Sequence, residues 1–160
     1  MLPFSITICA EAEVRELIDG HSHVLSITDP GSVAVIPGAA DTRVLRLQFH
    51  DVDGRPGDLG WLALLALGLR PVPPSAAHVR AILAFADGLA AGQRILIHCR
   101  AGVSRSTAAA AIIGCRRMPG REAEVFDHVR RIRPQALPNR LMIEIADRLL
   151  QADGRMIGCR

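Results

Sequence analysis

The segment Ile95-Leu-Ile-His-Cys-Arg-Ala-Gly-Val-Ser-Arg-Ser-Thr107 decides the expected fold and chemistry of this 160-residue chain. Its apolar first part has the unbroken character of a strand buried at the centre of a sheet. The small residues from Ser106 to Arg117 predict a helix that packs tightly in the core. Cys99 and Arg105 bound a short loop between these two elements. The segment therefore predicts a buried strand, a tight loop and a helix in direct succession.

The loop between this strand and this helix favours an anion. Such a loop directs backbone N–H groups toward its centre, and the helix that follows adds its positive end. The same field stabilises the thiolate of Cys99, which is the nucleophilic form of the side chain. Gly102 lets the backbone turn without a Cβ clash, and Arg105 offers a planar pair of donors that suits two phosphate oxygens. Ser106 is placed to hydrogen-bond the sulfur when Cys99 becomes the leaving group.

The residues His98, Cys99, Arg105 and Ser106 also carry a family resemblance. The sequence His98-Cys99-x5-Arg105-Ser106 resembles the HCxxGxxR[ST] motif of protein-tyrosine phosphatases, and HCRAGVSRS is similar to the compact dual-specificity branch, in a bacterial-type form. The resemblance extends to the early strands, to the helix before RILIHC, and to the segment 133–139 before the last helix.

The resemblance implies a role for each residue of the loop. Cys99 would attack phosphorus, and the phosphocysteine formed would then be hydrolysed. His98 would orient the loop and tune the thiol. The resemblance implies no metal and no organic cofactor. The phosphate would be bound by the loop residues Arg100, Ala101, Gly102, Val103, Ser104 and Arg105.

The leaving group needs a proton, which an upstream Asp supplies in relatives of this kind. Compact members place this general acid after a strand with a pattern like LxLxxxD, which residues 45–51 fit. We therefore expect Asp51 to be the general acid, with Asp53 as the second candidate and Asp58 as the third.

A surplus segment at residues 53–74 departs from the smallest members of the family. Its first part, residues 53–60, is rich in Gly, Pro and Asp and predicts a loop. Its apolar second part has two interpretations. One is a lid or specificity wall beside the active site, and the other, which we favour, is a short extra helix packed on the core.

The rest of the chain alternates between strand and helix patterns. β-branched and alternating runs predict strands at residues 5–9, 23–28 and 43–49, with residues 33–36 pairing beside the second. Helical spacing predicts helices at residues 11–18, 76–90, 106–117, 122–132 and 139–150, with Ser75 and Asn139 as N-caps. This pattern predicts a single α/β phosphatase domain over residues 1–160, with one central, mostly parallel sheet flanked by helices.

Composition and charge exclude several classes of protein. The net charge is +3 with scattered arginines and few aromatic residues, so we expect no nucleic-acid partner. The longest apolar run, residues 61–69, is too short to span a bilayer, and the first residues lack the basic start of a signal peptide. We expect a cytoplasmic monomer with no membrane partner that acts on a phosphoprotein or a small phosphoester. The absence of lysine indicates a GC-rich, bacterial genome.

Four further residues receive ordinary structural interpretations. Cys9 and Cys115 are expected to be inert core residues. His21 and His23 lack a third ligand nearby, so we interpret them as a surface pair rather than a metal site.

Two other functions remain open at this point. A rhodanese-like sulfurtransferase also has a cysteine loop before a helix, but its loop is usually one residue shorter, and both Ser104 and His98 favour the phosphatase. A non-catalytic phosphate-binding module would usually lack Cys99 or Arg105, and both are present.

Overall fold

A four-stranded parallel sheet forms the centre of the molecule. The computed structural model describes residues 2–38, 42–55 and 57–160. The strands are β1 (Ser5–Ala10), β2 (His23–Thr28), β3 (Arg43–Gln48) and β4 (Arg94–Cys99), in the spatial order β1-β4-β2-β3. All three pairings are parallel, and β4 lies between β1 and β2. The predicted α/β architecture with one sheet is confirmed, and the sheet is entirely parallel.

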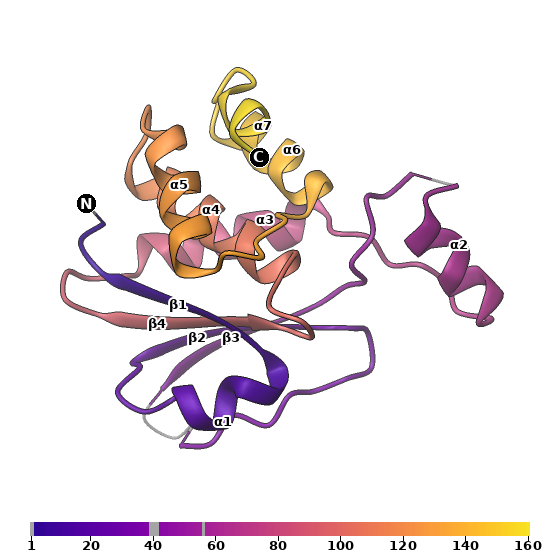
Figure 1. Cartoon of the computed structure of the whole chain (residues 1–160), viewed down its shortest axis with the longest axis horizontal. Helices are drawn as coiled ribbons and strands as arrows, with labels where there is room; N and C mark the ends of the chain where they lie inside the picture. The colour runs from indigo at the N-terminus through magenta and orange to yellow at the C-terminus, as the bar shows by residue number, and fades with distance from the viewer. Residues whose placement is uncertain (1, 39–41, 56) are drawn as a thin grey trace.

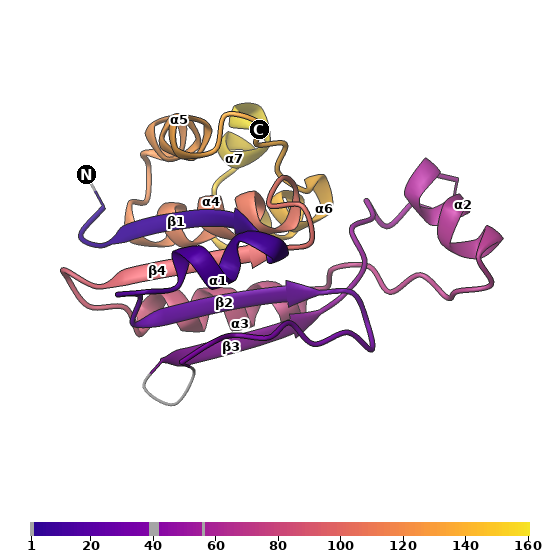
Figure 2. The same cartoon turned by 60° about the horizontal axis from the view of Figure 1, so that its bottom comes forward.

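Helices cover both faces of this sheet, more heavily on one side than on the other (Figures 1 and 2). The heavier layer packs around the central helix, α4, which is buried over most of its length. The short 3-10 helix η1 (Glu11–Glu13) and α1 (Val14–Leu17) lie over the opposite face. The heavier layer consists of α3 (Ala76–Asp87), α4 (Arg105–Arg117), α5 (Glu122–Ile132), α6 (Arg140–Leu149) and α7 (Arg155–Cys159).

Small side chains let α4 pack closely against its neighbours. Every residue from Arg105 to Cys115 is buried. A Cβ added at Gly114 would lie 2.5 Å from Cγ1 of Val125 on α5, so glycine is required for this close contact. The N-caps predicted at Ser75 and Asn139 are confirmed, because their side chains accept hydrogen bonds from His78 N and Met142 N.

Parallel strands bring their carboxyl ends to one edge of the sheet, and this edge positions the candidate site. Cys99 ends β4, Asp29 directly follows β2, and Asp51 follows β3 within three residues. Glu13 lies in η1, directly after β1. Four segments that are far apart in the sequence therefore meet at this edge.

Residues 33–36 form no strand, which corrects the sequence prediction. The segment is extended, with Val33 and Val35 exposed and the residues between and after them buried, so its pattern imitates a strand. Side chains of β3 bind its backbone in place of a ladder: Arg46 Nη1 donates to Ala34 O at 3.0 Å, and Gln48 Nε2 donates to Ser32 O at 2.6 Å.

The surplus segment contains the helix α2 (Leu59–Ala66), but this helix does not pack on the core. None of its residues is buried, and it stands away from the body of the molecule (Figures 1 and 2). The favoured interpretation, an extra helix packed on the core, was therefore wrong. The predicted loop at residues 53–60 includes Pro56, which lies outside the described residues, and gives way to α2 at Leu59.

Neither a membrane-spanning helix nor a metal-binding cluster is present among the described residues. No helix there combines the length and the apolarity needed to cross a bilayer. No three His, Cys, Asp or Glu side chains in the same ranges come together in a way that could hold a metal ion.

Candidate active site

The loop from Arg100 to Ser104 turns all its carbonyl groups outward. Arg100 O accepts from Glu11 N at 3.3 Å, Val103 O from Leu137 N at 2.9 Å, and Ser104 O from Asn139 N at 3.2 Å. Within the described chain, the backbone N–H groups of residues 101–104 have no hydrogen-bond acceptor. The outward carbonyls leave these N–H groups for the centre of the loop, which makes it a candidate anion cradle.

Arg133 holds this loop from behind. Its Nε donates to Gly102 O at 3.0 Å and its Nη2 to Ala101 O at 3.3 Å. The same Nη2 pairs with Glu13 at 3.1 Å, and Glu13 also accepts from Ala10 N at 2.6 Å. That backbone bond, assisted by Arg133, lowers the pKa of Glu13. Arg133 is half-buried and joins η1, the loop and the end of α5.

Gly102 occupies the tightest point of the loop. Its φ is +68°, in the left-handed region, and an added Cβ would lie 2.6 Å from Cys9 C and 2.7 Å from Ala10 N. Because both of these atoms belong to the backbone of β1, no side-chain movement could relieve the clash.

Cys99 lies at the bottom of the cradle, at the end of β4. Its side chain is buried, and its Sγ is 3.2 Å from Oγ of Ser106 in the first turn of α4. This contact is the one expected of a hydroxyl that stabilises the sulfur. Cys9, on the neighbouring strand, belongs to the cluster on the opposite face of the sheet. Burial raises the pKa of Cys9 to about 12 and that of Cys115 to about 12, so both fit inert core positions.

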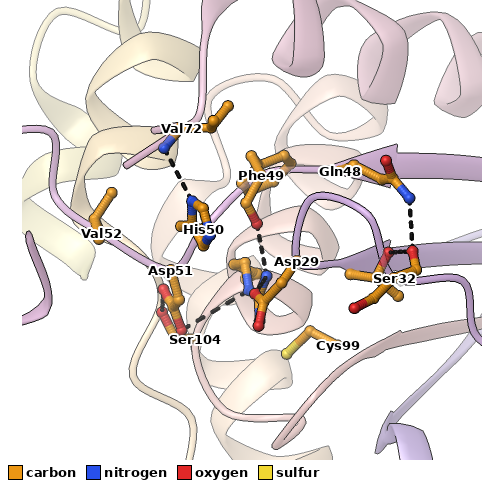
Figure 3. Close-up of polar contacts among 12 residues, drawn as sticks. Asp29, Ser32, Gln48, Phe49, His50, Asp51, Val52, Val72, Cys99 and Ser104 are labelled. Carbon is orange, nitrogen blue, oxygen red and sulfur yellow. Dashed lines mark hydrogen bonds and ion pairs between the residues drawn. The ribbon is translucent and has the colours of Figure 1, made fainter. Parts of the chain in front are cut away.

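Arg105 is fixed by one end of its guanidinium group. Its Nη1 donates to Asp29 Oδ1 and to Phe49 O, each at 2.7 Å (Figure 3). The side chain is 3% exposed, and no acceptor for its Nε is found in the described part of the chain. A buried donor without a partner is costly. The edge formed by Nε and Nη2 is therefore the part of Arg105 that can bind two oxygens of an anion.

Asp51 reaches the cradle from the end of β3. Its Oδ1 accepts from Ser104 Oγ at 2.6 Å and from Asn139 Nδ2 at 2.9 Å, and its Oδ2 is 4.0 Å from Arg105 Nε. Figure 3 shows the carboxylate beside Ser104. The structure thus brings together Asp51, Cys99 and Arg105, as the sequence predicts.

The other two acid candidates lie elsewhere. Asp58 caps α2 by accepting from Trp61 N at 2.5 Å, and its second oxygen accepts from Asp53 N at 3.3 Å. Asp53 is absent from the residues that line the cavity around Cys99.

His98 precedes Cys99 in β4 and is completely buried. Burial lowers its pKa to about 4, and the positive charges of Arg46 and Arg105 add to this effect. Neither ring nitrogen has a hydrogen-bond partner among the described residues. The imidazole is therefore neutral at pH 7, and within the described residues it forms no hydrogen bond by which it could orient the loop.

A cavity of about 280 Å³ opens over Cys99. Asp29, Asp51 and Arg105 line it, and a further wall comes from α2 and its C-cap residue Leu67. The residues of that wall follow helical spacing: Gly60, Ala63, Leu64 and Leu67.

His50 joins the two ends of the segment that carries this wall by hydrogen bonds. Its backbone N donates to Val72 O at 2.7 Å, and its Nδ1 accepts from Val72 N at 2.9 Å (Figure 3). Because His50 is adjacent to Asp51, this pair holds both ends of the α2 segment beside the candidate acid. The other interpretation of the surplus, a wall beside the site, agrees with this placement.

His21 and His23 are not a surface pair. Both are buried, and His21 Nε2 lies 2.9 Å from Thr7 Oγ1, which identifies it as a satisfied core histidine. Burial lowers the pKa of both rings.

Sequence reasoning missed Asp29, Glu13 and the second role of Asn139. Asp29 was part of a turn signal, Asp29-Pro30-Gly31, which gives no indication of an ion pair with Arg105. Glu13 lies three residues after the end of β1, at the same sheet edge as the motif, and this position was the one available signal. Asn139 fulfils its cap role and binds Asp51 with the same side chain.

The fold of this chain is similar to that of several solved phosphatase structures. A scan against protein-family models and a search of curated proteins both gave no match. The structure of DUSP15 is similar with a TM-score of 0.62 and 17% identity, over 93% of this chain and 85% of that chain. Human DUSP28 gives 0.54 and 20%, over 92% of each chain. PTPMT1 in complex with PI(5)P gives 0.61 and 16%, over 92% of this chain and 91% of that one. The chain therefore has the fold of the compact dual-specificity phosphatases, as its HCRAGVSRS motif predicts.

Proposed function

We propose that this protein is a cysteine-dependent phosphatase that hydrolyses phosphate monoesters through a phosphocysteine intermediate. The observation that carries the proposal is the convergence on one cavity of Cys99, the unpaired edge of Arg105 and Asp51. The outward carbonyls of residues 100–104 add the backbone donors that a phosphate group requires.

In the first step, Sγ of Cys99 attacks phosphorus while the bond from phosphorus to the ester oxygen breaks. The N–H groups of the loop and the Nε–Nη2 edge of Arg105 stabilise the charge that spreads over the phosphoryl oxygens. Asp51, in its protonated form, gives its proton to the departing oxygen. The products are an alcohol or phenol and phosphocysteine.

In the second step, water attacks phosphorus and the bond to sulfur breaks. The carboxylate of Asp51 accepts a proton from this water, which returns the acid to its starting form. Ser106, 3.2 Å from the sulfur, hydrogen-bonds the thiolate as it leaves. Inorganic phosphate is released, and Cys99 is regenerated.

The cavity supports an aryl phosphate, and thus phosphotyrosine in a protein, as the preferred substrate. Ala63, Leu64 and Leu67 give the cavity an apolar wall, against which the leaving group would lie. An aromatic ring gains more from such a wall than a short alkyl chain does, because it buries more apolar area. The loop interior has a single basic side chain besides Arg105, that of Arg100, which favours phosphoprotein over more highly charged inositol phosphates.

The test is hydrolysis of p-nitrophenyl phosphate, with a reductant and EDTA present, by wild type and by the Cys99→Ser and Arg105→Lys variants. We expect turnover by wild type, none by Cys99→Ser, and a loss of most activity in Arg105→Lys, because lysine keeps the charge but lacks the two-donor edge. Circular dichroism shows whether each variant keeps its fold. Turnover by folded Cys99→Ser at the wild-type rate would exclude the phosphocysteine route.

An assay of sulfur transfer from thiosulfate to cyanide, with the same preparation, tests the sulfurtransferase alternative. Binding of vanadate without any turnover would identify a non-catalytic phosphate-binding module.

A further inference from the structure

The large apolar side chains that this protein exposes gather around one opening. Among the described residues, all of them except Leu17 and Ile157 lie on three segments that border the candidate active site. These segments are α2 with its flank (residues 59–72), the extended segment with Val33 and Val35, and Leu137. We call them together the apolar rim. Contiguous exposed apolar surface of this kind marks a site of interaction.

The three segments surround the same cavity mouth. Val33 and Val35 line a cavity that shares Asp29 and Arg100 with the one over Cys99, and α2 lines the latter. Leu137 is 63% exposed, and its backbone N donates to Val103 O of the phosphate loop at 2.9 Å. The rim therefore encircles the opening through which a phosphate group would enter.

The helix α2 is apolar on all sides. Its sequence, Leu-Gly-Trp-Leu-Ala-Leu-Leu-Ala, contains no charged residue, and none of its side chains is buried in the protein. One face, with Leu64 and Leu67, lines the cavity. The other carries Leu59 (86% exposed), Leu62 and Leu65, which contribute nothing to that wall. Grooves on proteins are bordered by polar residues, whereas a helix that is apolar on every side, as α2 is, suits a hydrocarbon environment.

Charged residues lie at the base of this helix and at the mouth. Arg55 and Arg70 flank α2 and are exposed, and Arg15 and Arg100 are exposed where they line the mouth. The carboxylates of Asp29, Asp51 and Asp58 are each engaged within the protein. Glu11 at the mouth and Asp53 before α2 also carry negative charge, but the four arginines outnumber them. The net charge of the chain is +3. This arrangement, an apolar protrusion above exposed guanidinium groups, suits the negatively charged headgroups of a lipid surface.

We propose that the apolar rim docks the protein on an anionic lipid bilayer, with α2 inserted among the acyl chains and the cavity at the level of the headgroups. A helix of eight residues is about 12 Å long, which is far short of the hydrocarbon core of about 30 Å, so α2 can enter one leaflet only. The enzyme then meets phosphate groups presented at that surface. This docking rests on the proposed function only for the identity of the cavity, and it departs from the sequence expectation of no membrane partner.

The chain contains one tryptophan, Trp61, which lies on α2 and reports on this insertion directly. Wild-type protein is titrated with vesicles of phosphatidylcholine containing phosphatidylglycerol, and with vesicles of phosphatidylcholine alone. We expect a blue shift of Trp61 emission and quenching by brominated acyl chains with the anionic vesicles, and a weaker response at high salt. Unchanged emission and no co-sedimentation at any lipid concentration overturn the proposal.

The matched variants are Leu62→Glu/Leu65→Glu on the outer face of α2 and Ile157→Glu on α7, away from the rim. Each replaces apolar side chains that are about half exposed, at 49% and 51% on α2 and 45% on α7. The double variant is expected to lower vesicle partitioning roughly 100-fold or more, because the transfer of two leucine side chains from water into the bilayer no longer contributes to binding. Ile157→Glu is expected to bind as wild type. Equal binding by both variants overturns the proposal.

Hydrolysis of soluble p-nitrophenyl phosphate by the double variant serves as the fold control and is expected to be unchanged. An inactive wild type that still binds vesicles would refute the proposed function alone, and an active wild type that does not bind refutes the docking alone. Analytical ultracentrifugation without lipid tests whether a second copy of the chain covers the apolar rim instead. A dimer that the double variant abolishes would assign the rim to a second copy of the chain and overturn membrane docking.

Discussion

Asn139 Nδ2 donates a hydrogen bond to Asp51 Oδ1 at 2.9 Å, which joins two residues that are 88 positions apart in the sequence. The other atom of the same amide, Oδ1, accepts from Met142 N at 3.0 Å and begins α6. One side chain therefore caps a helix and orients the candidate acid. Ser104 completes this arrangement by donating to Asp51 from the phosphate loop at 2.6 Å.

Substitution of Asn139 separates its two roles. Serine keeps a cap acceptor but cannot donate to Asp51 from the same place, so Asn139→Ser should retain stability and lose activity. Asn139→Ala should lose activity and also about 1 kcal/mol of stability, because the cap is absent. Urea unfolding and kcat for phosphotyrosine peptide measure the two effects. If Asn139→Ser has the wild-type kcat, the hydrogen bond to Asp51 has no catalytic role.

Asp51 and Asp53 differ in their access to the leaving group. Asp51→Asn should lower the rate on phosphotyrosine peptide by about 10² or more, because no proton can be donated. The loss should be smaller for p-nitrophenyl phosphate, whose leaving group needs less assistance. Asp53→Asn, away from the cavity, should stay within about twofold of wild type. The opposite order of the two variants would move the acid to Asp53.

Asp29 holds Arg105 by an ion pair at 2.7 Å, and its role is one of position. Asp29→Asn keeps an acceptor for Nη1 and should keep most of kcat/KM. Asp29→Ala removes that acceptor and should lower kcat/KM by about tenfold, since the guanidinium edge is less well fixed. Steady-state kinetics on p-nitrophenyl phosphate distinguish the two variants. A similar large loss in both variants would mean that the charge of Asp29, rather than its hydrogen bond, is required.

Substitution of Gly102 tests how closely the loop packs against the backbone of β1. Gly102→Ala combines a positive φ with a Cβ placed 2.6 Å from the backbone of Cys9. Gly120 provides the control, because its φ is +82° and an added Cβ would meet nothing within 4 Å. We expect Gly120→Ala to cost about 1 kcal/mol in unfolding free energy and Gly102→Ala clearly more, together with lost vanadate binding. Equal unfolding midpoints would show that the loop can move away from β1.

His98 makes stability depend on pH. Its folded-state pKa of about 4 lies below the ordinary value of 6.5, so the unfolded chain binds a proton that the folded chain does not. Stability should therefore fall as the pH falls from about 6.5 to about 4, by roughly 3 kcal/mol from this residue alone. The unfolding free energy of His98→Asn should lose less over the same range. Parallel pH profiles for the two proteins would exclude His98 as a source of this dependence.

The sequence by itself determined the strand, loop and helix around Cys99 and the order of the elements. Residues 95–107 combine a buried apolar strand, Gly102 in a tight turn and small residues in a buried helix, and each of these depends on neighbours along the chain. The same local logic located β1–β4, α3–α6 and both N-caps. It also placed Asp51 at the end of a strand that a parallel sheet brings to the loop.

Only the tertiary structure decided the partners of these residues. The contacts of Asp29 with Arg105, Glu13 with Arg133 and Asn139 with Asp51 cross 76, 120 and 88 positions, and no periodicity in the sequence encodes them. The interpretation of α2 failed for the same reason. An apolar run has the same pattern whether it packs on the core or stands exposed, and the difference depends on whether another surface of the molecule is available to cover it.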